Sequence, residues 1–183
     1  MQLDFNDFYE IVSPRCTVLV STIDAQGRPN AAPFSFVTPV SASPPLILIV
    51  SVATRHTLAN IRETGEFVLN LVSEALLEPV MICSKPFARG VNEIKEAGLT
   101  EKPSRVVKVP SIAECFGWIE CRLAFEHVVG DRALVVGNVV NAEAKDETLI
   151  DGRLDIARVK PLLHIRGRRY VVGERAVEAR TTS

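Results

Sequence analysis

Apolar and polar positions along this chain form several short apolar, β-branched runs bounded by turn residues, which is the pattern of β-strands. Residues 17–23 and 31–40 are rich in apolar and β-branched side chains, and the turn-forming stretch DAQGRPN (24–30) separates them. This arrangement predicts an antiparallel hairpin. Residues 46–52 form a continuous apolar run, which predicts a strand buried on both faces, and residues 66–72 have strand composition again.

The second half of the chain also reads as β-structure. Residues 118–126 alternate cleanly, and the pattern places Ile119, Cys121, Leu123 and Phe125 on one face of a strand. Turns are expected at Gly130-Asp131 and Asp151-Gly152, and further strands over 133–144 and 162–172.

Three segments change to helical spacing. Residues 57–63 have apolar positions three apart and end before a glycine, residues 73–81 form a weaker helical pattern interrupted by Pro79, and residues 93–97 lie in a long loop excursion over 84–110. About seven strands with short helices predict a mainly β fold, an antiparallel barrel with helical insertions. We expect a single domain over residues 1–183, with a core of about 13–172.

Composition and charge exclude several classes of protein. The 183 residues carry 21 basic and 22 acidic side chains, a net charge of −1. Nucleic-acid binding needs a net basic face, so we do not expect it as the main activity. The apolar runs are far shorter than the ~18 residues that a spanning helix needs, and the N-terminus lacks a secretory pattern. The four cysteines form no CxxC pair. We therefore expect a cytoplasmic protein with reduced cysteines and no metal site.

The segment Ser51-Val52-Ala53-Thr54-Arg55-His56-Thr57-Leu58 leaves the apolar strand and enters a helix, with Thr54 as the expected N-cap. The first helical turn carries no carboxylate, so its free amides, the helix dipole, a guanidinium and several hydroxyls together suit a phosphate group. An ordinary capped helix with a solvated arginine is the alternative.

Two aromatic residues flank a serine in the stretch Ala31-Ala32-Pro33-Phe34-Ser35-Phe36. Strand geometry places the two phenylalanines on one face and Ser35 on the other. Because Pro33 donates no backbone hydrogen bond, we expect an edge strand or an interrupted one, with free amides for a planar heteroaromatic ligand. Two core phenylalanines on an edge strand are the alternative.

Two polar segments remain ambiguous from their residues alone. The loop 84–93 (SKPFARGVNE) reads either as a solvated connector or as part of a site. The stretch 164–170 (HIRGRRY) holds three arginines that could receive an anionic substrate, or it forms a solvated turn. The chain has no GxSxG, GxGxxG, HExxH or Walker motif, and no two carboxylates stand out as a catalytic pair.

Taken together and in order, these segments resemble the flavin reductase-like family of FMN-binding split barrels, the flavoredoxin-type proteins. The resemblance covers about residues 13–170. The stretches that carry it are 14–15 (PR), 24–30 (DAQGRPN), 31–36 (AAPFSF), 44–46 (PPL), 55–61 (RHTLANI) and 65–70 (GEFVLN).

The resemblance implies a homodimer of split β-barrels that binds FMN near the subunit interface. It places Phe34, Ser35 and Phe36 along the flavin ring, and Ser51, Thr54, Arg55 and Thr57 around its phosphate. It also implies that a loop carrying Ser84, Phe87 and Gly90 closes over the flavin and that Tyr170 lies nearby. Arg166 and Ile94 differ from the residues that many relatives carry at these positions, which bears on a nicotinamide or partner pocket.

The implied activity is that of an NAD(P)H-dependent flavin reductase or oxidoreductase. In such a protein the flavin carries the redox chemistry: a hydride passes from NADH or NADPH to flavin N5, and the electrons go on to an acceptor. This accounts for the lack of a catalytic pair in the chain. Two alternatives stay open: an electron carrier that is reduced by a redox partner protein, and a non-enzymatic module that binds or stores flavin.

Overall fold

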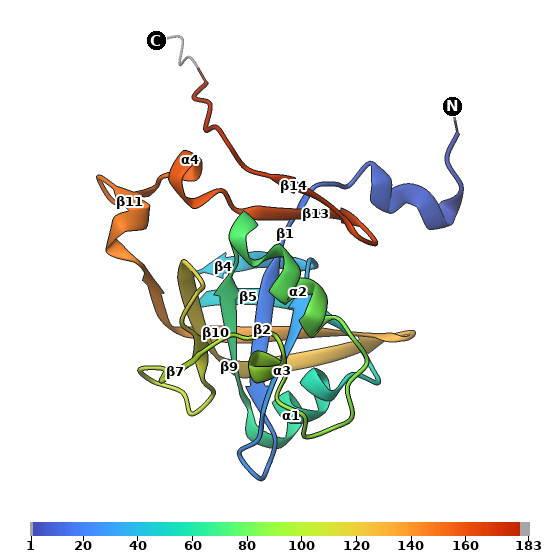
Figure 1. Cartoon of the computed structure of the whole chain (residues 1–183). Coiled ribbons are helices and arrows are strands. Elements are labelled where there is room, and N and C mark those ends of the chain that lie inside the picture. Colours follow the sequence, from blue (N-terminus) through green and yellow to red (C-terminus); the bar gives the residue numbers. More distant parts are fainter. Residues whose placement is uncertain (1, 180–183) are drawn as a thin grey trace.

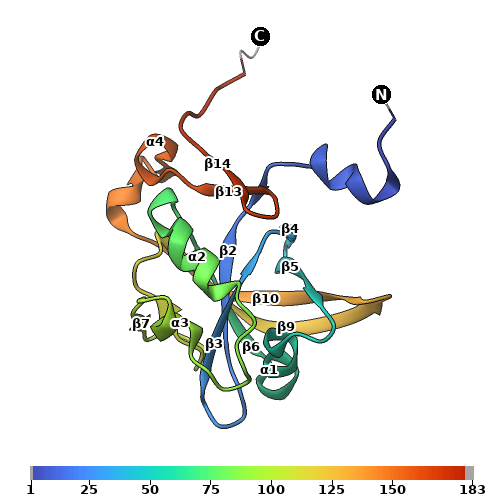
Figure 2. The same ribbon diagram turned by 45° about the vertical axis from the view of Figure 1, so that its right-hand side comes forward.

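The computed structural model describes residues 2–179, which form a curled antiparallel sheet with helices on its flanks (Figures 1 and 2). The seven strands of the main sheet lie in the order β3-β2-β6-β9-β10-β5-β4. Their bounds are β2 (Val18–Ile23), β3 (Pro29–Phe34), β4 (Val37–Ala42), β5 (Pro45–Val52), β6 (Glu66–Leu71), β9 (Gly117–Val129) and β10 (Arg132–Ala144).

Smaller sheets and short helices complete the fold. The sheet β1-β13-β14 lies across one end of the barrel, close to both ends of the described chain (Figure 1). The remaining strands are β1 (Arg15–Cys16), β7 (Glu101–Lys102), β8 (Ser111–Ile112), β11 (Leu149–Ile150), β12 (Arg153–Leu154), β13 (Leu162–Arg166) and β14 (Arg169–Val172). The helices are α1 (His56–Thr64), α2 (Leu77–Cys83), α3 (Glu93–Glu96), α4 (Ile156–Val159) and the 3-10 helices η1 (Phe5–Glu10), η2 (Glu74–Leu76) and η3 (Asp146–Thr148).

A two-residue connection forces the sheet to curl. Strands β3 and β4 are the two edges of the main sheet, yet only Ser35 and Phe36 separate them in the chain. Seven flat strands would place the edges about 29 Å apart, at about 4.8 Å per pair. The three Cα steps from Phe34 to Val37 reach about 11 Å at most. The edges must therefore meet, and since β3 and β4 do not pair in the described sheet, they leave a seam.

Two hydrophobic clusters occupy the two faces of the central strands. Val18 and Val20 of β2 point into the barrel with Leu58 and Ile61 of α1, whereas Leu19 points to the layer that contains α2 and α3. Strand β6 is buried on both faces in the same way. The helices therefore close the barrel and cover one outer flank.

The prediction that residues 46–52 are buried on both faces is wrong. In β5 only alternate residues are buried, among them Ile47 and Ile49, while Leu48 and Val50 are half-buried. The run is continuous because the second face of β5 is also apolar. Helices α2 and α3 do not cover that face, because they pack against β3 at the other edge of the sheet.

The predicted alternation of β9 holds as far as Leu123 and fails at Phe125. Leu123 pairs with Gly137 and Phe125 with Val136, so a β-bulge places one extra residue between them. Because Gly137 and Val136 are consecutive in β10, their side chains point to opposite faces. Phe125 therefore lies on the outer face and is 56% exposed.

The predicted single strand 31–40 is instead two strands, β3 and β4, because the chain leaves one edge of the sheet at Ser35 and Phe36 and joins the other. Most other predicted elements are confirmed. The hairpin β2–β3 forms around residues 24–28, helix α1 ends at Gly65 with φ of +71°, and α3 is capped by the Asn92 side chain. The predicted strand 162–172 is instead the hairpin β13–β14, which turns at Gly167. The fold is mainly β and antiparallel, as expected. Across residues 2–179, every helix is too short or too polar to cross a membrane.

Candidate functional site at the barrel seam

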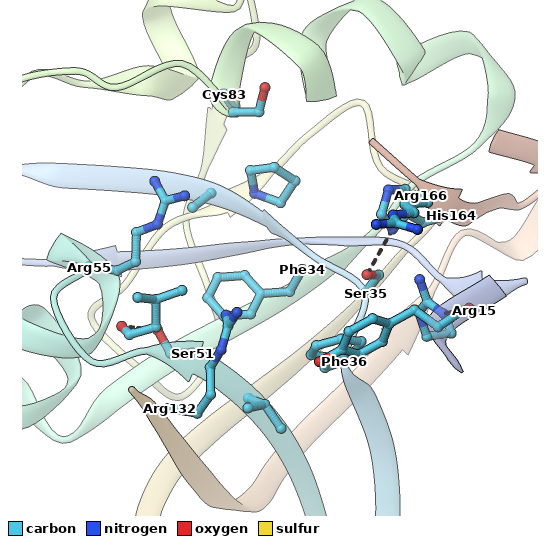
Figure 3. Close-up of a pocket in the computed structure, with 16 residues that line it drawn as sticks. Arg15, Phe34, Ser35, Phe36, Ser51, Arg55, Cys83, Arg132, His164 and Arg166 are labelled. Atoms are coloured by element: carbon cyan, nitrogen blue, oxygen red, sulfur yellow. Dashed lines mark hydrogen bonds between the residues drawn. The ribbon is translucent and has the colours of Figure 1, made fainter. Parts of the chain in front are cut away.

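A pocket of about 350 Å³ opens where the two edges of the sheet meet (Figure 3). It therefore lies at the one place where the closure of the barrel leaves the backbone irregular. The residues that line it come from η1, β1, the end of β3 and the seam, β5, the start of α1, the end of α2, the start of β10, and β13. They are Tyr9, Arg15, Ala32, Pro33, Phe34, Ser35, Phe36, Val50, Ser51, Val52, Arg55, Cys83, Ser84, Arg132, His164 and Arg166.

Aromatic side chains form one wall of this pocket, which we call the larger pocket because a smaller one adjoins it. Phe34, Ser35 and Phe36 all line it, because β3 ends at Phe34 and the next two residues leave the strand. The expected division into opposite faces therefore does not hold. Tyr9 stacks on Phe36 with ring centroids 5.6 Å apart, and the Arg15 guanidinium carbon lies 5.4 Å from the centre of the same ring. This wall suits a flat, polarisable ligand.

One end of the larger pocket carries two arginines beside a helix N-terminus. Arg55 and Arg132 lie on the same side of Phe34 in Figure 3. The predicted N-cap is off by one residue: α1 begins at His56, its N-cap is Arg55 rather than Thr54, and no side chain caps it. Its first turn also lacks an acidic residue, so backbone N–H groups and positive charge stay available for an anion.

The other end of the larger pocket holds two arginines that already have protein partners. Arg15 donates to the carbonyl oxygens of Tyr9, Val12 and Ile165 at 3.0, 2.9 and 2.5 Å, yet its buried Nε–H finds no acceptor among the described residues. The guanidinium of Arg166 lies 2.5 Å from Asp7 and 3.4 Å from Glu10 of η1. An unpaired buried donor is costly unless a ligand accepts from it.

A serine and a histidine form a fixed pair between these ends. Ser35 Oγ lies 3.0 Å from Nδ1 of His164, and Nε2 of the same ring lies 3.2 Å from the carbonyl oxygen of Gly167. A carbonyl only accepts, so Nε2 carries the proton and Ser35 donates to Nδ1 of the neutral ring. Burial and the nearby Arg15 charge lower the pKa of His164, which favours this neutral form.

A smaller pocket of about 160 Å³ adjoins the larger one. Both are lined by Pro33, Phe34, Ser35, Ser84 and His164. The walls that belong to the smaller pocket alone are Thr17, Met81, Gly167 and Tyr170.

Seven of the eleven expected site residues line these two pockets. Phe34, Ser35, Phe36, Ser51, Arg55 and Ser84 line the larger pocket, and Tyr170 lines the smaller one. The structure thus brings together residues that lie up to 136 positions apart in the sequence.

Four expected residues, Thr54, Thr57, Phe87 and Gly90, lie outside both linings. The Thr57 hydroxyl points into the interior, where the Asn30 amide donates to it at 3.2 Å. Gly90 lies against the Arg28 guanidinium of the β2–β3 turn, which a Cβ would contact at 2.6 Å. The loop after Ser84 therefore packs toward that turn rather than over the pocket.

The lining includes residues that the sequence did not single out as site residues, among them Tyr9, Arg132 and His164. Arg132 reaches the site because it pairs with Val52 of β5, a register that only the folded sheet defines. Cys83 also lines the pocket, but burial and the nearby Glu93 raise its pKa to about 12, so it is a neutral thiol. Ile94 lies instead in the hydrophobic core.

Comparison with known proteins relates the chain to one family. The family model described as a flavin reductase like domain matches residues 12–173. An uncharacterized protein of Halalkalibacterium halodurans is 37% identical over 171 residues, which cover 87% of this chain and 81% of that protein.

Solved structures agree with this relation. The 2-nitrobenzoate 2-nitroreductase NbaA of Pseudomonas fluorescens superposes with a TM-score of 0.86 at 27% identity, covering 99% of this chain and 93% of that one. A Shewanella frigidimarina protein with a split barrel domain gives a TM-score of 0.87 at 21% identity, over 98% and 94% of the two chains. The fold is therefore the split barrel.

The Ser35–His164 pair generates a first prediction. His164 should titrate below the ordinary histidine pKa of about 6.5, because burial and Arg15 disfavour its charged form. Ser35→Ala removes the hydroxyl that donates to neutral Nδ1, so the pKa should rise back toward that value. NMR titration of the imidazole ¹⁵N signals measures the pKa of His164 in both proteins. A His164 pKa at or above 6.5 in the wild type would contradict the assignment.

Proposed function

The chain belongs to the flavin reductase-like family, and from this premise we propose that it binds FMN in the larger pocket and acts as an NAD(P)H-dependent oxidoreductase. The observation that carries the proposal is the pocket itself, which combines an aromatic wall at the barrel seam with two arginines and an uncapped helix N-terminus at one end.

The phosphate of FMN fits the end that holds Arg55 and Arg132. Arg55 has no salt bridge within residues 2–179, and Arg132 makes only a 3.5 Å contact with its chain neighbour Asp131. The Ser51 hydroxyl lies on the same wall; it donates to the Val52 carbonyl oxygen at 3.1 Å and would rotate away from that carbonyl to donate to the phosphate. Guanidinium groups, a hydroxyl and free backbone N–H groups are the donors that a phosphate dianion requires.

The flavin ring fits the aromatic wall. Phe34 and Phe36 supply flat apolar surface, and the unpaired Nε–H of Arg15 offers a donor for a polar edge of the ring. FMN, when bound, supplies the redox chemistry by taking up a hydride from NADH or NADPH and passing electrons to an acceptor. The chain's own part is to anchor the phosphate, orient the ring and keep His164 neutral beside it.

Arg55 provides a direct test of the phosphate site. Arg55→Ala should weaken FMN binding by about 1.5–3 kcal/mol, the scale of a hydrogen bond to a charged group. Titration of the FMN-free protein with FMN, followed by flavin fluorescence, measures the change. Arg153→Ala removes an exposed arginine of the β11–β12 hairpin and should leave FMN affinity as it is. Equal affinities of the Arg55 variant and the wild type would remove Arg55 from the site.

Anaerobic titration of the FMN-loaded protein with NADH and then NADPH tests the proposed activity. We expect loss of the visible flavin absorption with one of the two donors. A flavin that stays oxidised with both donors but is reduced by a partner protein would favour the electron carrier. A flavin that neither donors nor partner proteins reduce would favour the storage module.

We also propose that the protein is a homodimer, because the outer face of β4, β5, β10 and β9 is apolar and uncovered in one chain. Val40 and Phe125 are 49% and 56% exposed on these strands, and Leu48 and Val50 between them are half-buried. An exposed apolar sheet face of this kind is typical of a protein interface. Since β5 also lines the larger pocket, a second copy on this face would lie beside the proposed flavin site.

Phe125→Glu places a charge on this face and should convert the dimer to a monomer. Analytical ultracentrifugation at several concentrations measures the effect. Ile150→Glu alters a side chain of similar exposure, 54%, on the separate hairpin β11–β12 and should leave the dimer intact. A wild-type protein that sediments as a monomer throughout would refute the proposal.

The cysteines support a cytoplasmic location as a further part of the proposal. All four are free thiols, and Cys83, Cys115 and Cys121 are buried. Free buried cysteines are typical of proteins from reducing compartments.

A further inference from the structure

The short helix η1 near the N-terminus has three faces of different chemistry. In a 3-10 helix, side chains three positions apart eclipse one another, so a sequence repeat of three produces three separate faces. Helix η1 has such a repeat: Asp7 and Glu10 form an acidic face, Phe5 and Phe8 form an apolar face, and Tyr9 lies on the third. Each face can therefore meet a different partner.

Two of these faces are engaged within the chain. The guanidinium of Arg166 in β13 forms ion pairs with both Asp7 and Glu10 on the acidic face. On the third face, Tyr9 stacks on Phe36 and lines the larger pocket. The helix is therefore fixed to the rim of the larger pocket, and this fixes the direction in which the apolar face points.

The apolar face of η1 is left in solvent. Phe5 is 96% exposed and Phe8 is exposed as well, and the same face continues into Ile11, which is 74% exposed, and the exposed Val12. These side chains belong to residues 3–12, which we call the arm and which project beyond the barrel (Figures 1 and 2). A run of exposed apolar side chains on one face is typical of a contact surface.

The outer face of the main sheet carries an apolar surface of its own. Leu48 of β5 pairs with Val136 of β10, which pairs in turn with Phe125 of β9, and Val50 pairs with Leu134 beside them. Cross-strand partners lie on the same face, so these five residues form an uncharged apolar patch, which we call the outer patch. Phe125 is exposed, whereas η1 packs against β13, so the arm does not cover this patch in its own chain.

The arm and the outer patch are arranged so that a second copy can cover both. In Figures 1 and 2 the arm and the β9–β10 hairpin, which carries part of the patch, project toward the same side of the molecule. A two-fold axis on that side would set the arm of each copy against the patch of the other. Two uncovered apolar surfaces of one chain would thus be buried by a single symmetric contact.

The charge of the arm favours a protein partner over a membrane. Residues 3–12 contain the three acidic residues Asp4, Asp7 and Glu10 and no basic residue. Segments that insert into a lipid surface carry lysine and arginine on their polar face, because anionic lipids attract basic groups and repel acidic ones. The outer patch is uncharged, so it presents no such repulsion to the arm.

We propose that the apolar face of the arm packs on the outer patch of a second copy of the chain, and that the two copies exchange this contact reciprocally. The inference rests on the homodimer proposed above and identifies the segment that covers its sheet face. Because η1 also places Tyr9 in the larger pocket, each exchanged contact lies directly behind one wall of the proposed flavin site.

Photo-crosslinking tests where the arm binds. Full-length protein carrying p-benzoylphenylalanine in place of the exposed Phe5 is mixed with an equal amount of ¹⁵N-labelled wild-type protein, allowed to exchange subunits and irradiated. The isotope label shows by mass spectrometry whether a cross-link joins two copies. We expect cross-links from the arm to peptides of β4, β5, β9 or β10 in the labelled copy.

A matched pair of variants tests whether the arm contributes to dimer stability. Ile11→Ser should raise the dimer dissociation constant about tenfold or more, because a two-fold dimer buries this side chain twice. Val177→Ser alters a side chain of nearly equal exposure, 75%, on the segment after β14 and should leave the constant unchanged. Analytical ultracentrifugation measures both, and circular dichroism confirms that each variant is folded.

Two results would overturn the inference and leave the homodimer standing: cross-links confined to the arm's own chain or to another surface of the labelled copy, or equal dissociation constants for Ile11→Ser and the wild type. A wild-type protein that stays monomeric would refute the homodimer together with the inference, and co-sedimentation of that monomer with phosphatidylcholine vesicles would assign the arm to a membrane surface instead. Neither measurement requires FMN, so a failure to bind FMN would refute the flavin site alone.

Discussion

The two-residue connection between β3 and β4 is the constraint on which the rest of this structure depends. It joins the two edges of a seven-stranded sheet, and no flat sheet allows so short a link. The sheet must curl, but Ser35 and Phe36 are taken out of the ladder to make the connection. Closure of the barrel and the irregular backbone at the pocket are therefore two consequences of one geometric requirement.

The seam also explains how the charges of the site are arranged. Strand β5 and the start of α1 bring Arg55 to one end, and the β1–β13 pairing brings Arg15 and His164 side by side at the other. The sheet β1-β13-β14 contributes His164 and Tyr170 to the lining of the smaller pocket, which holds no arginine, lysine or carboxylate among the described residues. A region rich in arginine and an uncharged one thus lie next to each other.

Much of this fold could be predicted from local pattern. Apolar and β-branched runs between turn residues located β2, β6 and β10, and the glycine after residues 57–63 marked the end of α1, because these features depend on near neighbours in the chain. The failures share a different cause. The apolar outer face of β5, the bulge before Phe125 and the path of the loop carrying Gly90 all depend on what packs against these residues from distant segments.

The sequence by itself determined the β-rich class, the order of the elements and the segments from which the site would be built, because turn residues and side-chain periodicity act within a few positions. The tertiary structure alone decided that Arg132, His164 and Tyr9 join Phe34 and Arg55 in one pocket, and that Thr57 does not. Strand register and the curling of the sheet determine which of these side chains lie close together. Both are fixed only when residues far apart in the chain pack together.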